Sequence, residues 1–150
     1  MSTEDGSFEV LEGYPEDVVA ISAHGHISRQ DYEDVLIPLV EARIKKEGKV
    51  KLLYVCGSDF EGLSAGAALD DAKLGLLHLG EFARVAVVAD ADWIRLGVRM
   101  FAPLMRCPVH LFHLGETEVA KAWLLKDVPE DAGGPEVAAD RKLPTLEDKM

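Results

Sequence analysis

Two kinds of hydrophobic pattern alternate along the chain between residues 8 and 126. Short apolar runs such as "VKLLYVC" (50–56) and "ARVAVVAD" (83–90) are typical of β-strands, and the second is apolar enough to be covered on both faces. Longer segments carry apolar residues at every third or fourth position, which is the spacing of a helix with one buried face. The predicted strands are 8–13, 17–27, 50–56, 83–90 and 108–115, and the predicted helices are 28–48, 65–79, 91–105 and 116–126.

The order of these elements predicts an α/β fold. The turn sequence "YPED" separates the first two strands, so we expect them to pair as an antiparallel hairpin. The later strands alternate with helices, which favours a mixed, mostly parallel sheet flanked by helices in the order β-β-α-β-α-β-α-β-α. We interpret residues 1–126 as a single domain and the segment 127–150 as a flexible acidic tail.

Individual residues make the helix predictions more specific. Ser28 stands where a helix N-cap is expected, and Pro38 should kink the same helix because it lacks a backbone N–H. On the last helix, the residues expected to face the sheet are Val119, Ala122 and Trp123.

Charge and composition narrow the range of functions. The 150 residues include 16 Lys and Arg against 27 Asp and Glu, and the resulting net charge of −11 opposes binding to a nucleic-acid backbone. No apolar run is long enough for a membrane span, and "MSTEDGSFEV" lacks the apolar core of a secretory signal. We therefore expect a cytoplasmic protein that does not bind nucleic acid.

Metal and redox chemistry have little support in the sequence. Cys56 and Cys107 lie at the ends of apolar runs and form no C-x-x-C pair, so we expect buried free thiols. His24 and His26 are two apart on a strand and share a face, but such a pair alone is more often surface or hydrogen-bonded core than a metal site. No metal and no cofactor is predicted.

The segment "GSDFEGLSAGAALDD" (57–71) carries the main functional signals because it is predicted to join a strand to a helix. Its glycines match neither common phosphate-binding loop, and Asp59 and Glu61 would repel a phosphate. Ser64 lies in G-L-S-A-G, which is similar to the nucleophile elbow of hydrolases. The motif is too far from the strand, however, and no suitably placed acid and histidine follow it, so no catalytic residue is predicted.

Two acidic residues and two tryptophans complete the set of candidates. Asp70 and Asp71 are adjacent on a helix and lie about 100° apart around its axis, so they cannot form a matched acid–base pair. We expect one of them to be solvated and the other to meet a basic side chain or a backbone donor. Trp93 and Trp123 have the character of core residues, and we keep Trp93 as a candidate ligand contact.

Four segments taken together resemble the SpoIIAA-like family of bacterial proteins. They are "GHISRQDYEDVLIPLVEARI" (25–44), "LLYVCGSDFEGLSAGAALDDAKLGLLH" (52–78), "FARVAVVADADW" (82–93) and "HLFHLGETEVAKAWL" (110–124). This family looks like a branch of the STAS fold of anti-sigma-factor antagonists, and its architecture is also similar to CRAL-TRIO lipid-carrier domains. The resemblance covers about residues 8–126 and implies a mixed sheet with helices, but no established activity.

The resemblance also gives the segment after the third strand a specific meaning. STAS antagonists carry D-S-[ST]-G-[LI] at this turn, and the hydroxyl residue before the glycine is phosphorylated. Here the matching residues 59–63 read D-F-E-G-L, so Glu61 occupies the place of the phosphoacceptor and both hydroxyl positions are lost. Glu61 either imitates a phosphorylated state by permanent charge or is a solvent-facing residue without a role. Ser58 and Ser64 flank this place and remain alternative acceptors.

Two functional hypotheses follow from the sequence. The first is a non-enzymatic STAS-like binding or regulatory domain that recognises a protein partner through the segment 57–71. The alternative is a carrier or sensor of a small apolar ligand or lipid, because the helices 65–79 and 91–105 have more apolar residues than one buried face requires. The same excess suits a homodimer interface or a doubly buried core. The candidate binding residues are Asp59, Phe60, Glu61, Gly62, Ser64, Asp70, Asp71 and Trp93.

Overall fold

Five strands form one sheet in the order β1-β2-β3-β4-β5. The computed structural model describes residues 6–126, and the predicted tail, 127–150, lies outside the described residues. The strand β1 pairs with β2 in the antiparallel sense, and each later pair is parallel, which confirms the predicted mixed sheet. The strands are β1 (Ser7–Val10), β2 (Val18–Ile27), β3 (Val50–Leu63), β4 (Phe82–Ala89) and β5 (Val109–Phe112).

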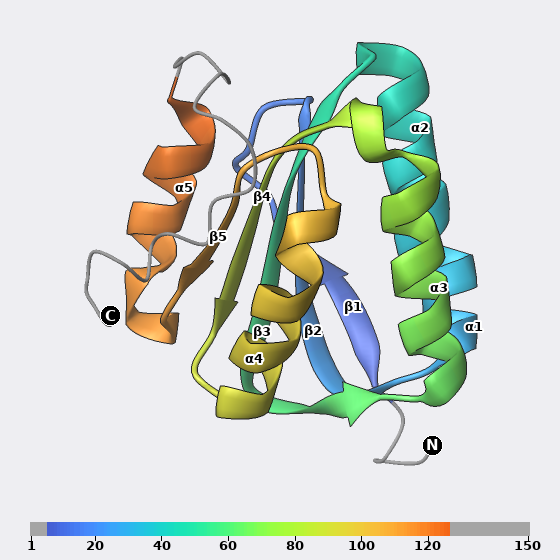
Figure 1. Ribbon diagram of the computed structural model, residues 1–150, viewed down its shortest axis with the longest axis vertical. Coiled ribbons are helices and arrows are strands. Elements are labelled where there is room, and N and C mark those ends of the chain that lie inside the picture. Colours follow the sequence, from blue (N-terminus) through green and yellow to red (C-terminus); the bar gives the residue numbers. More distant parts are fainter. Residues whose placement is uncertain (1–5, 127–150) are drawn as a thin grey trace.

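Helices cover both faces of this sheet (Figure 1). They are α1 (Arg29–Asp31), the π-helical turn η1 (Tyr32–Leu36), α2 (Ile37–Glu47), α3 (Ala65–Leu77), α4 (Asp92–Phe101) and α5 (Thr117–Leu125), with short 3₁₀ turns η2 (Leu79–Glu81), η3 (Ala102–Leu104) and η4 (Leu114–Glu116). Side chains alternate along β2, so Val19 and Ile21 pack with α2, α3 and α4, whereas Val18 and Ala20 pack with α5. None of the helices between residues 6 and 126 has the length and apolar character needed to cross a membrane.

The helix predicted at 28–48 contains a widened helical turn just before Pro38, the residue at which a kink was predicted. Ser28 caps α1 as expected, since its hydroxyl oxygen accepts from the Asp31 N–H and the Asp31 carboxylate accepts from the Ser28 N–H. In η1 the Ile37 N–H donates to the carbonyl of Tyr32, five residues earlier. Pro38 then stands in the first turn of α2, directly after this widened turn, where it has no N–H to donate to the preceding turn.

The segment that we predicted as a turn, 57–63, is instead the second half of β3. The neighbouring strand β2 runs on past Ala23 and supplies the backbone partners for this extension, with shifts of register on the way. The pairs are Gly25 with Phe60, His26 with Gly62 and Ile27 with Leu63. Gly62 has a φ of +133°, a conformation that favours glycine. The prediction was wrong because the glycines indicated a local turn, whereas pairing with a distant segment decides the conformation.

The inward face of α5 also differs from the prediction. Ala120 and Leu124 are fully buried, whereas Val119 is 56% exposed and Ala122 is also exposed. Trp123 is half-buried and stacks on His110, with ring centroids 4.2 Å apart. Trp123 also packs against the buried cluster on this face, as predicted, so the departures from the prediction are Val119 and Ala122.

Other element boundaries shift by a few residues. The helix predicted at 65–79 ends at Leu77, and the last strand, predicted at 108–115, is limited to Val109–Phe112. These differences leave the order of the elements unchanged, as expected for boundaries that depend on helix ends and strand pairing.

Candidate ligand-binding cavity

A cavity of about 290 Å³ lies between one face of the sheet and the helices α3 and α4. Its floor is formed by side chains of the central strands β3 and β4, which include Leu52, Tyr54, Cys56, Val85 and Val87. A Cβ atom at Gly75 would lie 3.4 Å from Phe101, so the two helices approach each other at this glycine. A Cβ atom at Gly97 would meet no atom within 4 Å, so the absent side chain of Gly97 contributes to the open space.

Three polar side chains meet at the closed end of this cavity. Tyr32 donates a hydrogen bond to Asp71 Oδ1 at 2.9 Å, and the hydroxyl oxygens of Tyr32 and Tyr54 lie 2.8 Å apart. Tyr32 is fully buried and Tyr54 is nearly so. Burial raises the pKa of both phenols, and the Asp71 carboxylate raises it further. Burial also raises the pKa of Asp71, against the opposing effect of the hydrogen bond from Tyr32. The phenols are therefore neutral hydrogen-bonding groups near pH 7.

The two cysteines are buried free thiols, as predicted. Cys56 lines the cavity, and burial together with the nearby Asp71 raises the pKa of its thiol to about 12. A thiol that stays protonated near neutral pH is a poor nucleophile. Cys56 therefore contributes to the cavity mainly as a small apolar side chain.

A stacked aromatic pair, Phe60 and Trp93, lies on the open side of the cavity. Their ring centroids are 6.0 Å apart and their planes differ by 18°. Trp93 is 57% exposed, so it is a rim residue and not the core residue that its type suggested. A Cβ atom at Gly62 would lie 3.9 Å from the Trp93 ring. The extension of β3 thus brings Phe60 and Gly62 to Trp93, which comes from a different part of the chain.

The other candidates in the segment 57–71 divide between structural and exposed positions. Ser64 caps α3, because its hydroxyl oxygen accepts from the Ala67 N–H at 3.0 Å. Asp59 and Glu61 are exposed, and neither of them lines the cavity. Phe60, Asp71 and Trp93 are therefore the predicted residues that the cavity brings together.

Asp70 corrects the expectation that one of the adjacent acidic residues is solvated. Its side chain is buried, and the Asp70 carboxylate lies 3.6 Å from Arg29 Nε, whereas Asp71 is partly buried in the cavity wall. The two helices are close here, since a Cβ atom at Gly66 would come within 3.1 Å of the Arg29 Cβ. The packing of α1 on α3 supplies this cationic partner, which is far from Asp70 in the sequence.

His24 lies on β2 between two carboxylates, one from the edge strand β1 and one from β3. Its Nδ1 lies 2.8 Å from Asp59 Oδ2, and its Nε2 lies 3.0 Å from Glu9 Oε1. The hydrogen bond to Asp59 is the main cause that raises the pKa of His24. Within residues 6–126, no group of three His, Cys, Asp or Glu side chains is arranged to hold a metal ion.

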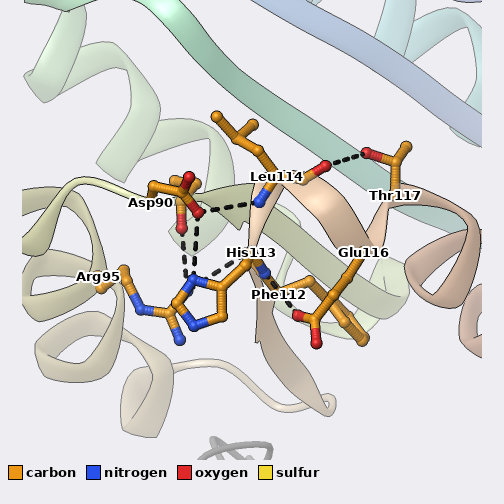
Figure 2. A network of polar contacts seen from close by, with 8 residues as sticks. Asp90, Arg95, Phe112, His113, Leu114, Glu116 and Thr117 are labelled. Carbon is orange, nitrogen blue, oxygen red and sulfur yellow. Dashed lines mark hydrogen bonds and ion pairs between the residues drawn. The ribbon is translucent and has the colours of Figure 1, made fainter.

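Sequence reasoning did not single out a polar network at the carboxyl ends of β4 and β5, which Figure 2 shows. Asp90 accepts a hydrogen bond from the Leu114 N–H at 3.0 Å, and His113 Nδ1 lies 3.1 Å from the same carboxylate. The Leu114 N–H is the main cause that lowers the pKa of Asp90, and His113 adds to it. These contacts join the end of β4 to the turn that precedes α5.

Arg95 is the buried member of this network (Figure 2). Its Nη1 donates to the carbonyl of Ala89 at 2.9 Å and to the carbonyl of Phe112 at 3.2 Å. One side chain of α4 thus holds the carboxyl ends of two neighbouring strands. Because Trp93 is two residues earlier on the same helix, Arg95 also fixes the helix that carries the rim of the cavity.

Tyr32 and Tyr54 are the cavity residues that the sequence did not indicate as a functional pair. Their spacing along the chain is 22 residues, and Asp71 follows a further 17 residues later, so no motif links the three. A weak signal exists in that a buried tyrosine needs a partner for its hydroxyl group. The sequence alone does not say which partner it finds.

The fold and the cavity together define an α/β domain built on a single mixed sheet, with an apolar cavity beneath two of its helices. Residues 18–125 match the SpoIIAA-like family. A crystal structure of an uncharacterised protein from Shewanella loihica PV-4, of the DUF3478 family and with a SpoIIAA-like fold, is similar to this chain with 27% sequence identity and a TM-score of 0.64. The similarity covers 83% of this chain and 98% of that chain. No protein of curated function matches the sequence.

The family match extends over well more than half of the chain, so the protein belongs to the SpoIIAA-like family. This confirms the family resemblance and the fold that it implied. The family match identifies neither a ligand nor a protein partner, so both are inferred from the residues of the site.

Proposed function

We propose that this domain binds a small, mostly apolar molecule in the cavity between the sheet and the helices α3 and α4, as a carrier or a sensor. The cavity itself is the observation that carries the proposal. Among the described residues that line it, Asp71 alone has a charged side chain. Its volume of about 290 Å³ is close to the lower end of the range of roughly 300–1,000 Å³ that is usual for ligand sites.

The energetic cost of such a space supports an occupant. A fully enclosed cavity costs about 24 cal/mol per Å³ relative to a packed core, so 290 Å³ sets an upper limit of about 7 kcal/mol for this partly open one. This is a large share of the roughly 5–15 kcal/mol by which a domain is stable. A ligand that fills the cavity would restore much of the lost packing.

The surface next to the cavity is also apolar. Gly97 and Phe101, which line the cavity, are flanked along α4 and η3 by exposed apolar side chains, namely Trp93, Leu96, Met100 and Leu104. On α3, Leu69, Leu76 and Leu77 are similarly exposed. The exposure of these side chains favours a pocket or an interface over the interpretation of the excess as doubly buried core. An apolar rim would assist the transfer of an apolar ligand. A homodimer that forms through the same surface stays a prediction, which sedimentation equilibrium can test.

Native mass spectrometry of freshly purified protein tests the proposal, with the same sample denatured as a reference. We expect an adduct that is lost on denaturation. The variant Gly97→Leu should carry less of it because the new side chain occupies the opening, and Gly97→Ala serves as the matched control at the same position. The absence of an adduct, together with no binding of added small apolar compounds, would contradict the proposal.

A second candidate function is the recognition of a protein partner through the segment 57–71, as the resemblance to STAS antagonists suggested. The exposed position of Glu61, at the place of the phosphoacceptor in STAS antagonists, favours it. Glu61→Lys should then abolish capture of a partner, whereas the matched charge reversal Glu118→Lys on α5 should not. Since Glu61 does not line the cavity, both variants should load ligand equally. Partner capture that survives Glu61→Lys would exclude this surface.

A further inference from the structure

The direction of the hydrogen bonds at the closed end of the cavity determines what a ligand can usefully present there. Tyr32 has a single hydroxyl proton, which it donates to Asp71 Oδ1. The 2.8 Å contact between the two phenol oxygens must therefore use the proton of Tyr54. Both protons point along the chain of contacts towards Asp71. The groups that remain for a ligand are acceptors: a lone pair of the Tyr54 oxygen and the carboxylate oxygens of Asp71.

The rest of the lining adds no strong donor and no positive charge. Among the described residues that line the cavity, Cys56 has the only other polar hydrogen on a side chain apart from the Trp93 ring at the rim, and a thiol is a weak donor. A carboxylate ligand would thus face the like charge of Asp71 without a compensating cation. A ligand that offers only acceptors, such as an ether, would leave the carboxylate without a donor. A hydroxyl group satisfies the acceptors and introduces no charge.

The volume of the cavity limits the size of the ligand. An apolar cavity of roughly 150 Å³ accommodates benzene, with six carbon atoms, so the 290 Å³ found here corresponds to about twelve non-hydrogen atoms. A two-chain lipid is several times too large to enclose. Tyr32 is fully buried and Trp93 is 57% exposed, so the polar end of the ligand would lie inside and its apolar end towards the rim.

Building on the proposed ligand-binding function, we propose that the cavity is selective for a compact apolar alcohol of about twelve non-hydrogen atoms. The hydroxyl group of this alcohol donates to Asp71 or Tyr54 at the closed end, and the apolar part extends between Phe101 and the Phe60–Trp93 pair. Selection against carboxylates comes from the charge of Asp71, and selection against ethers comes from the lack of a free donor on either phenol.

Three probes of nearly equal size test this selectivity. Decan-1-ol and 1-methoxynonane are isomers, of which only the alcohol has a donor, and decanoate replaces the hydroxyl group by a carboxylate. Binding at pH 8 is followed by the fluorescence of Trp93 and, independently, by calorimetry. The variant Trp93→Phe establishes which part of the fluorescence change arises at the cavity, since Trp123 packs on the opposite face of the sheet. We expect decan-1-ol to bind about fivefold more tightly than the ether and at least about tenfold more tightly than decanoate.

Two adjacent carboxylates provide a matched pair of variants. Asp71→Asn removes the charge and adds an amide donor in the cavity, so decanoate should bind within about twofold of decan-1-ol. Asp70→Asn changes a buried carboxylate that does not line the cavity, so the preference for the alcohol should remain. Tyr54→Phe provides a second variant within the site, and it should reduce the preference for the alcohol over the ether.

The outcomes separate this inference from the proposed function. Equal binding of the three probes by the unmodified protein, or an unchanged preference in Asp71→Asn, would overturn the selectivity for alcohols while the ligand-binding function stands. If none of the three probes binds and the purified protein carries no adduct, the ligand-binding function itself fails. A preference for the alcohol that Asp71→Asn abolishes and Asp70→Asn preserves supports the assignment.

Discussion

The chain of hydrogen bonds from Tyr54 through Tyr32 to Asp71 predicts unequal effects of two similar substitutions. Tyr54→Phe removes only the bond from Tyr54 to Tyr32, a bond between neutral groups that contributes about 1 kcal/mol to stability. Tyr32→Phe removes that bond and the bond to the carboxylate, which contributes about 2 kcal/mol because the acceptor is charged. The expected losses in the free energy of unfolding are therefore about 1 and about 3 kcal/mol.

The double variant tests the direction of the chain. In Tyr32→Phe the hydroxyl group of Tyr54 stays buried without its acceptor, so removing it as well should cost nothing and relieve part of the penalty. We expect the double variant to lose at most about 3 kcal/mol, the contribution of the two bonds together, below the sum of about 4 kcal/mol that independent sites would give. Urea unfolding followed by circular dichroism measures all three values, with equal slopes as the check that the unfolding transition is unchanged.

One result would refute this reasoning. If Tyr54→Phe destabilises the domain as much as Tyr32→Phe, then Tyr32 is not the central member of the chain and its proton is not committed to Asp71. In that case the cavity would not present only acceptors to a ligand.

Three further predictions address other parts of the structure. Gly97→Ala should stabilise the domain by about 1 kcal/mol in urea unfolding, because alanine favours the helix and a Cβ atom there meets no neighbour; a loss of stability would show that the site is not open. Arg95→Met should cost about 3 kcal/mol through two lost bonds to buried carbonyls, whereas the exposed Arg106→Met should have little effect, and equal unfolding midpoints would contradict the role given to Arg95. The pKa of His24 is raised in the folded state by Asp59, so this contact stabilises fully below the His24 pKa of the unfolded chain and is lost as pH rises through the folded-state pKa. Asp59→Asn should reduce this decline in the unfolding midpoint above roughly pH 6.5, with Glu9 retaining the rest, and an unchanged profile would assign the decline to other groups.

The sheet and its layers could be predicted from the sequence because one-residue alternation decides which side chains meet. The alternation along residues 18–21 puts Val19 and Ile21 on one face of the strand and Val18 and Ala20 on the other, and the structure places the two sets in separate clusters. Strand–helix alternation then gave the order of the elements. These features depend on local periodicity, which a single sequence contains.

The errors arose where a distant segment decides the local conformation. Glycines at positions 57 and 62 indicated a turn, but the length of β2 provides partners that keep the chain extended to Leu63. On α5, Val119 and Ala122 were expected to face the sheet, whereas Ala120 and Leu124 occupy that face together with the half-buried Trp123. In both cases the residue types were compatible with two structures, and the choice was made by packing.

Several residues of the candidate site were predicted from the sequence, but the cavity that they line was not. Phe60, Asp71 and Trp93 were selected from the sequence, mainly as contacts for a protein partner, and the structure gathers them around a cavity. The excess of apolar residues on two helices did indicate this region. The sequence could not show that Tyr32 and Tyr54 complete its closed end, because their contact exists only once η1 packs on the sheet.

Residues 60 and 61 show why the two proposed functions are compatible. The resemblance to STAS antagonists places Glu61 where those proteins carry a phosphorylated hydroxyl group, and in this chain Glu61 is exposed. Its neighbour Phe60 lines the cavity, since successive residues of a strand point to opposite sides. A ligand that contacts Phe60 would therefore contact the residue next to Glu61, the exposed position at which a protein partner would bind. Under the two proposals taken together, occupancy of the cavity would be the input that phosphorylation provides in the antagonists.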